Sequence, residues 1–182
     1  MNIPNALSLL RIFLVAPFLI AVIYHAYLLA LILFVTAGIS DYLDGYLARR
    51  LEQKSVLGSF LDPMGDKLLI AVAFVALAVQ GQLPAWLAVI VVAKDVYTAM
   101  GAGILHFSGH FSVAIPSFWG KLSTLLQIVT IGLVLLIPLV TLGTSLLNVF
   151  FVATGCVAVI ACVQYILGGI QEFAANAESA NQ

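Results

Sequence analysis

Residues 40–69 read SDYLDGYLARRLEQKSVLGSFLDPMGDKLL, and the architecture of the chain follows from this stretch. It contains five of the eight acidic residues and four of the seven basic residues of the protein. The sequence on both sides of it consists mainly of Leu, Ile, Val, Ala and Phe. Charge is therefore gathered in one place within a chain that otherwise has very little.

The composition is that of an integral membrane protein. The chain has 182 residues, of which 63% are hydrophobic and 8% are charged, and its mean hydropathy is +1.17. Soluble domains carry about 25% charged residues, so this chain has too few to cover a surface that faces water. We expect a single domain over residues 1–182. The net charge of -1 and the absence of a basic run argue against a nucleic-acid partner.

Six apolar runs are long enough to cross a bilayer, which takes about 20 residues per helix. They cover residues 7–24, 27–50, 58–79, 84–107, 118–141 and 145–173. The sequence thus predicts an all-α polytopic membrane protein, with six transmembrane helices in one bundle and a polar cavity that faces the cytoplasm. We expect residues 1–6 to form a short interfacial segment rather than a signal peptide, and the tail after residue 173 to be frayed.

The distribution of Lys and Arg predicts the orientation. Arg49, Arg50 and Lys54 lie between the second and third runs, and Lys121 flanks the connection between the fourth and fifth. The three opposite connections carry no Lys or Arg. Because cytoplasmic loops are enriched in these residues, we expect both termini and the charged connection to be cytoplasmic, in a multi-pass protein of the cell membrane.

Two pairs of aspartates lie inside the predicted helices. Asp41 and Asp44 are three residues apart and Asp62 and Asp66 are four apart, so each pair occupies one helix face. The two helices are joined by a short connection and must run antiparallel, which lets the two faces meet at one depth. A carboxylate at the centre of a bilayer costs about 2.5–3.5 kcal/mol, and four converging carboxylates also repel one another.

Positive charge must compensate the aspartates. Lys67 and Arg49 can supply part of it, and a hard divalent cation such as Mg²⁺, which takes oxygen ligands, can supply the rest. Small residues at Gly45, Ala48 and Gly58 follow the same faces and allow close approach of a helix or a ligand. On the residues alone, this ion site fits either an enzyme or a divalent-cation transporter.

The spacing of these residues resembles a known family. The pattern is Asp41-x-x-Asp44-Gly45-x-x-Ala48-Arg49, eight residues, Gly58-x-x-x-Asp62-x-x-x-Asp66, which is similar to the motif of the CDP-alcohol phosphatidyltransferases. Eight identities at fixed offsets make a specific signal. NIPNALSLLRI at 2–12 and WGKLSTLLQ at 119–127 also resemble the phosphatidylglycerophosphate synthases and the CMP-forming cardiolipin synthases of that family.

The resemblance implies a reaction and a set of roles. Members of the family move a phosphatidyl group from a CDP-linked lipid to an alcohol and release CMP. It implies that Asp41, Asp44 and Asp62 bind divalent metal, Mg²⁺ or Mn²⁺, with two ions at the site. Asp66 would act as the base on the acceptor hydroxyl and also contact metal. The residues implied in holding the CDP moiety of CDP-diacylglycerol are Asn5, Gly45, Ala48, Arg49, Ser55 and Gly58.

The acceptor is predicted to be an anionic alcohol. Arg11, Lys94 and Lys121 lie within or at the ends of spans near the cytoplasmic side, where they could line its pocket. Each could instead reach to the interface, and Lys94 could simply neutralise Asp95. Glycerol 3-phosphate is the acceptor that we favour, and phosphatidylglycerol, which would give cardiolipin, is the alternative.

Other interpretations remain open at this point. The four acids could belong to a divalent-cation transporter, although the opposite ends of the spans carry no charged residue. A family member that has lost activity and serves as a membrane partner is a third reading. Besides membrane lipids and the two substrates, a second copy of the chain is an expected partner, because the family is commonly dimeric.

Overall fold

The computed structural model describes the backbone of residues 3–51, 56–107, 118–140 and 144–179, and the side chains of residues 11–40, 67–101, 118–140 and 145–169. Over these ranges the chain forms six α-helices and one 3-10 turn. They are α1 (Ile3–Ile23), α2 (Tyr27–Leu51), α3 (Val56–Val79), α4 (Ala85–Phe107), α5 (Phe118–Leu136), η1 (Ile137–Leu139) and α6 (Thr144–Ser179). The all-α prediction is confirmed.

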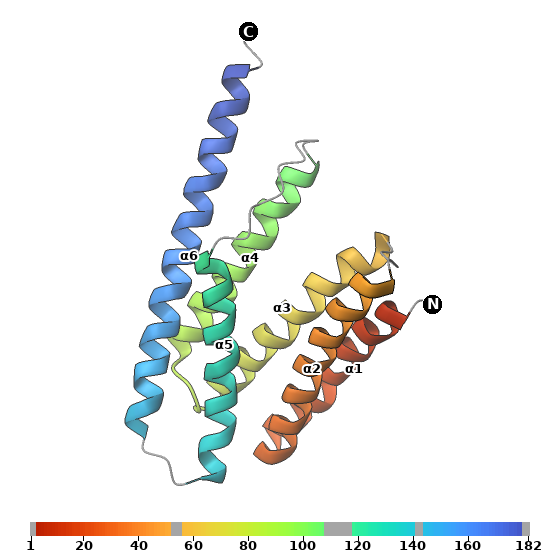
Figure 1. Cartoon of the computed structure of the whole chain (residues 1–182). Coiled ribbons are helices and arrows are strands. Elements are labelled where there is room, and N and C mark those ends of the chain that lie inside the picture. The colour runs from red at the N-terminus through yellow and green to blue at the C-terminus, as the bar shows by residue number, and fades with distance from the viewer. Residues whose placement is uncertain (1–2, 52–55, 108–117, 141–143, 180–182) are drawn as a thin grey trace.

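The helices run alternately up and down (Figure 1). The starts of α1, α3 and α5 and the ends of α2, α4 and α6 all lie at one end of the molecule. The ends of α1, α3 and α5 and the starts of α2, α4 and α6 lie at the other end. The end of α2, which holds Arg49 and Arg50, therefore lies at the same end of the molecule as the start of α1 and the end of α6.

Two of the tight junctions have the same backbone chemistry. His25 and Gly81 adopt positive φ angles of 58° and 70°, and each ends the helix before it. At the first junction the Ala26 N–H donates to the Ala21 carbonyl at 2.8 Å, and at the second the Gln82 N–H donates to the Leu77 carbonyl at 2.9 Å. These bonds satisfy carbonyls that a helix end would otherwise leave unpaired. The chain can therefore reverse direction within a few residues.

The core is apolar and draws on every helix. α1 packs against α2 and α3, α6 packs against α4 and α5, and α2–α5 and α3–α4 contacts join the two groups. Large fully buried side chains include Phe18, Val22, Phe74, Leu77, Leu87, Val91, Ile131 and Leu135. Phe18 of α1 and Phe34 of α2 are in ring contact, with centroids 6.1 Å apart.

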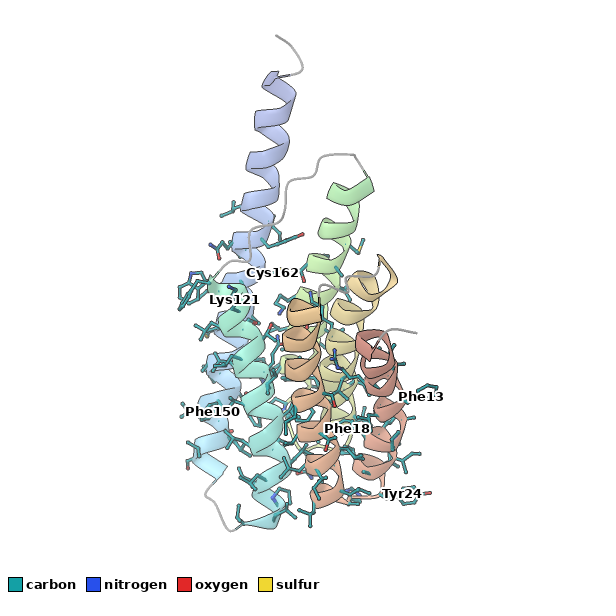
Figure 2. All side chains as sticks on the ribbon, turned by 45° about the vertical axis from the view of Figure 1, so that its right-hand side comes forward. Phe13, Phe18, Tyr24, Lys121, Phe150 and Cys162 are labelled. Atoms are coloured by element: carbon teal, nitrogen blue, oxygen red, sulfur yellow. The ribbon has the colours of Figure 1, made fainter. Side chains whose placement is uncertain are left out.

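The outer surface is also apolar. Figure 2 shows Phe13 and Tyr24 projecting away from the bundle, and both side chains are exposed. Within the described residues, two helical segments are long and apolar enough to cross a membrane, Phe118–Leu139 and Ser145–Gly169. Only 33% of the apolar stretch of each segment is buried. A core helix of a soluble protein would be mostly covered. The outward faces of these helices therefore suit a lipid environment.

Glycines let α4 and α6 approach closely. A Cβ at Gly155 of α6 would lie 2.7 Å from the ring of Trp86 of α4, and a Cβ at Gly101 of α4 would lie 2.7 Å from the ring of Tyr165 of α6. Each helix thus supplies one glycine and receives one aromatic ring from its partner. In apolar surroundings such small-residue contacts hold helices together by van der Waals packing.

The helix bounds differ from the predicted runs mainly at the chain ends. α1 begins at Ile3, so Pro4 and Asn5 lie in its first turn and do not form a separate segment. A proline is tolerated there because the first amides have no partner within the helix. α6 continues to Ser179, so the prediction of a frayed tail after residue 173 is wrong. α5 gives way to η1 at Ile137, where Pro138 cannot continue an α-helix.

One buried hydroxyl pair joins α5 to α6. Thr130 Oγ1 and Thr154 Oγ1 are 2.7 Å apart, and both residues are fully buried. In an apolar interface a hydroxyl without a partner is costly, so the pair favours one register between the two helices.

We predict that Thr154→Val destabilises the protein, because it leaves the Thr130 hydroxyl without this partner. The expected loss is about 0.6–1.7 kcal/mol, the range for interhelical hydrogen bonds in membrane proteins. Thermal unfolding in detergent micelles measures it for each single variant and for Thr130→Val/Thr154→Val. The double variant should cost less than the sum of the singles, and strict additivity would contradict a coupled pair.

Candidate functional site

A cavity of about 460 Å³ lies among four helices. Its lining residues come from α1 (Arg11), α2 (Phe34, Val35, Ala37, Gly38 and Ile39), α3 (Leu69 and Ile70) and α5 (Thr124 and Ile128). Among the described lining residues, Arg11 is the charged one and Thr124 contributes a hydroxyl. The size suits a small-molecule or lipid-chain site. The described lining is otherwise apolar, and the polar part of the predicted cavity would involve side chains outside the described residues.

Helix register connects this cavity with the aspartates. On α2, Asp41 follows the lining residues Gly38 and Ala37 by three and four positions. On α3, Asp66 precedes Leu69 and Ile70 by three and four positions. Residues with these spacings share a helix face, about 5–6 Å apart along the axis. Each aspartate pair therefore continues a helix face that lines the cavity.

The helix faces that carry the two aspartate pairs continue from the cavity toward the same end of the molecule. α2 runs toward its junction with α3, and α3 runs away from it (Figure 1). Moving forward along α2 from Ala37 and backward along α3 from Ile70 therefore leads to the same end. The backbone therefore carries the two aspartate pairs toward one end of the molecule, and the predicted meeting of their faces concerns side chains outside the described residues.

The side chains of the aspartate motif lie outside the described residues. Asp41, Asp44, Gly45, Ala48 and Arg49 belong to α2. Gly58, Asp62 and Asp66 belong to α3 and Asn5 belongs to α1, whereas Ser55 falls between the described helices. Among the side chains that are described, no group of three His, Cys, Asp or Glu residues could hold a metal ion. The predicted ligands Asp41, Asp44, Asp62 and Asp66 carry carboxylate oxygens, the donor type that Mg²⁺ or Mn²⁺ prefers.

A polar cluster lies at the contact of α3, α4 and α5. It consists of Lys67, Lys94, Asp95, Thr98, Ser123 and Gln127. Asp95 Oδ1 is 2.8 Å from Lys94 Nζ and 3.9 Å from Lys67 Nζ, so one carboxylate faces two ammonium groups. Lys94 Nζ also donates to Ser123 Oγ at 3.4 Å. The predicted neutralisation of Lys94 by Asp95 is therefore present.

The rest of the polar cluster orients these charges. Gln127 Nε2 donates to Ser123 Oγ at 3.3 Å, and Lys67 Nζ donates to Thr98 Oγ1 at 3.3 Å. Lys94, Asp95, Ser123 and Gln127 are all buried, whereas Lys67 is partly exposed. Buried charges persist in an apolar bundle only when they are paired and hydrogen-bonded. The polar cluster is therefore an integral part of the folded interior and not an incidental surface contact.

The three cations predicted for the acceptor have different surroundings. Arg11 is buried and lines the cavity. Lys94 is buried in the polar cluster. Lys121 is exposed at the start of α5, and Figure 2 shows it at the end of the molecule toward which α6 extends. An exposed lysine at a helix end suits the interfacial reading that the sequence left open for Lys121.

The sequence analysis missed Ser123 and Gln127. They are spaced four residues apart, and Thr130 follows at the next turn, so one polar stripe runs through an otherwise apolar helix. A polar stripe inside a predicted span is itself a signal of buried hydrogen bonding. It was available in the stretch 119–127, which carried the weaker part of the family resemblance.

Comparison with known proteins connects these observations. The chain matches the CDP-alcohol phosphatidyltransferase family over residues 1–167. It belongs to the CDP-alcohol phosphatidyltransferase family. The match includes the aspartate motif, the cavity and the polar cluster. The family acts in lipid biosynthesis, and α5 and α6 expose apolar faces. This chain is therefore a membrane protein.

Three relatives indicate where the chain lies within the CDP-alcohol phosphatidyltransferases. It is 37% identical to the "Probable phosphatidylglycerophosphate synthase" of Mycobacterium tuberculosis, over 74% of this chain and 66% of that protein. It is 31% identical to the CDP-diacylglycerol--glycerol-3-phosphate 3-phosphatidyltransferase of Bacillus subtilis, over 74% and 77% of the two chains. It is 39% identical to the "Probable cardiolipin synthase (CMP-forming)" of Drosophila melanogaster, over 76% and 48%. The chain thus spans just under two thirds of the mycobacterial relative and about half of the Drosophila one.

We predict that Asp95→Asn destabilises the protein by about 3–5 kcal/mol, because it leaves the buried Lys94 ammonium without its carboxylate. The midpoint of thermal unfolding in detergent micelles measures the loss. Lys121→Met, which removes a charge from an exposed side chain, is the control and should change stability by less than about 0.5 kcal/mol. The double variant Lys94→Met/Asp95→Leu should be more stable than Asp95→Asn. If Asp95→Asn unfolds at the same temperature as the wild type, the ion pair has no structural role.

Proposed function

We propose that this protein is a six-span membrane enzyme that transfers a phosphatidyl group from CDP-diacylglycerol to glycerol 3-phosphate, giving phosphatidylglycerophosphate and CMP. The observation that carries the proposal is the register of α2 and α3, which continues both aspartate pairs from one cavity to one end of the bundle. The family match over residues 1–167 and relatives named for this reaction support it.

The proposed topology has six crossings with both termini and the aspartates on the cytoplasmic side. Six helices that alternate in direction, with both termini at one end, support an even number of crossings. Arg49, Arg50 and Lys121 all belong to that end. A cytoplasmic site suits the reaction, because CMP and glycerol 3-phosphate are soluble and the diacylglycerol tails remain in the bilayer.

We assign the divalent metal to Asp41, Asp44, Asp62 and Asp66. The family is generally dependent on divalent cations, and four carboxylates on two antiparallel helices fit Mg²⁺ or Mn²⁺ by ligand type. When bound, two such ions would neutralise the pyrophosphate and stabilise the negative charge that develops on CMP. Without cations the four carboxylates would repel one another, so their grouping also favours an ion site.

The protein's own side chains then have three tasks. Arg49, with its planar and permanently charged guanidinium, holds the phosphates of the donor. The small residues Gly45, Ala48 and Gly58 leave room for the cytidine and pyrophosphate, and Asn5 and Ser55 contribute polar contacts. Asp66 accepts the proton of the acceptor hydroxyl as that oxygen bonds to phosphorus and the bond from phosphorus to the CMP oxygen breaks.

Lys94 is the cation that we assign to the anionic acceptor. It is held by Asp95 and Ser123, and Lys67 lies on the other side of the same carboxylate. Two ammonium groups around one carboxylate leave a net positive charge in the polar cluster. That excess suits the phosphate of glycerol 3-phosphate, with Lys67 directly following Asp66 in the sequence.

Phosphatidylglycerol is the second candidate acceptor, and the product would then be cardiolipin. The relative named as a cardiolipin synthase is 39% identical to this chain, so phosphatidylglycerol is still a candidate acceptor. Its phosphate is also anionic, so the net charge of the polar cluster does not distinguish the two alcohols. Relatives named for glycerol 3-phosphate as acceptor lead us to favour that substrate.

We predict that the purified protein in mixed micelles with CDP-diacylglycerol and Mg²⁺ releases CMP when glycerol 3-phosphate is added. Asp66→Asn should lower that release by at least about a hundredfold, in the range that general acid–base catalysis contributes. Asp62→Asn should also lower it, because it removes one of the carboxylates assigned to the metal. Glu172→Gln in α6 is the matched carboxylate-to-amide control, since it lies beyond the residues matched to the family. CMP release that is unchanged in both aspartate variants would contradict the catalytic assignment.

The same assay separates the acceptors. CMP release with glycerol 3-phosphate alone is the expected result, and release with phosphatidylglycerol alone would make the protein a cardiolipin synthase. Removal of divalent metal with a chelator should abolish release in either case, and Mg²⁺ should restore it. Binding of metal without any chemistry on CDP-diacylglycerol would favour the transporter reading.

A further inference from the structure

The cavity has a buried inner wall and an exposed rim, and α2 contributes to both. The buried lining residues are Arg11, Phe34, Ala37, Leu69 and Ile70, from α1, α2 and α3. The exposed lining residues are Val35, Gly38 and Ile39 of α2 and Thr124 and Ile128 of α5. The cavity therefore opens to the outside between α2 and α5.

The surroundings of this opening are apolar. Val35, Ile39 and Ile128 expose 47%, 56% and 46% of their surface, and none of the three side chains can form a hydrogen bond with water. Neighbouring outward residues of the same two helices, Ile32 and Leu125, are also exposed. In a membrane protein such a surface faces acyl chains, so the opening is lateral and leads to the bilayer.

The cavity lining carries two polar side chains. Arg11 and Thr124 lie about 12 and 9 Å from the first residues of α1 and α5, both of which start at the aspartate end of the molecule. The apolar lining residues extend from Gly38 and Leu69, each three residues from an aspartate in the sequence, to Phe34, about 25 Å from the last residue of α2. Such a lining suits an amphipathic ligand whose chain extends toward Phe34.

Gly38 keeps the opening wide. A Cβ added at Gly38 would meet no atom within 4 Å, in contrast to Gly101 and Gly155, which are needed for helix packing. A glycine inside a helix costs about 1 kcal/mol relative to alanine, and helix packing does not account for this one. It lies instead on the rim of the cavity, where any side chain would project into free space.

We propose that this cavity receives an acyl chain of the lipid donor laterally from the bilayer, between α2 and α5, and that Gly38 keeps its mouth open to long chains. Gly38 is thus a specificity-determining residue for acyl-chain length, and Arg11 faces the glycerol and phosphate end of the same lipid rather than the soluble acceptor. The inference rests on the proposed function, because it takes CDP-diacylglycerol as the donor. The occupant follows from the lateral apolar opening, the mainly apolar lining and the continuity with the aspartate faces.

The test compares two leucine variants. Gly38→Leu fills the mouth, whereas Gly132→Leu in α5 introduces the same side chain at another glycine whose Cβ would meet nothing within 4 Å and which does not line the cavity. The KM for CDP-dioleoylglycerol and for CDP-dihexanoylglycerol is measured for both variants and the wild type, with Mg²⁺ and glycerol 3-phosphate. Gly38→Leu should raise the ratio of long-chain to short-chain KM about tenfold. Gly132→Leu should leave the ratio at the wild-type value.

An equal KM ratio in all three proteins would overturn the inference. A general loss of folding cannot imitate the expected result, because it would affect both donors alike. If Gly132→Leu changes the ratio as much as Gly38→Leu, chain length is sensed by the bundle as a whole and not by this opening, which also overturns it.

A second measurement does not depend on enzymatic activity. CDP-diacylglycerol with a photoreactive diazirine in one acyl chain is irradiated with the wild-type protein, and the labelled residues are found by mass spectrometry. Labels at Val35, Ile39 or Ile128 that disappear in Gly38→Leu support the proposed entry. Labels spread over outward residues such as Val152 and Val159 contradict it. If the wild type releases no CMP with any acceptor, the proposed function fails, and the labelling pattern still decides whether the cavity binds the lipid.

Discussion

The cost of placing charge in an apolar environment accounts for the surroundings of Lys94, Asp95 and Lys121. Lys94 and Asp95 are buried only because they form a 2.8 Å ion pair with hydrogen-bonding neighbours on α5. Lys121, which has no such partner set, is exposed at a helix end. The same constraint makes the grouping of four aspartates on α2 and α3 meaningful, since carboxylates gather within apolar helices only where cations compensate them.

Sequence patterns predicted the helices well because membrane helices are defined by hydropathy over long windows. The runs at 27–50, 58–79 and 84–107 each differ from α2, α3 and α4 at one end only, by one or two residues. The errors occurred where hydropathy carries no information. α6 continues through Ala174–Ser179, half of which is alanine, because helix propensity, not burial, decides there, and Pro138 ends α5 for steric reasons.

The candidate site was predictable in part. The spacing of Asp41, Asp44, Asp62 and Asp66 predicted two acidic helix faces, and α2 and α3 carry these positions toward one end of the molecule. Arg11 lines the cavity and Lys94 pairs with Asp95, and neither setting could be predicted, because hydropathy and spacing do not tell which neighbours a single cation meets. The cavity mouth at Gly38 could not be predicted either, since it depends on the distance between α2 and α5, which are far apart in the sequence.

That separation has a consequence for assembly. The inner wall of the cavity is made by α1, α2 and α3, whereas one side of its rim is supplied by Thr124 and Ile128 of α5. During synthesis the aspartate-bearing hairpin of α2 and α3 is complete long before α5 emerges from the ribosome. Until then the groove beside Ala37 and Gly38 is a broad open face that surrounding lipid can fill. Docking of the fifth helix turns that face into a bounded opening, so the lateral opening is completed late, after the aspartate-bearing helices are already in place.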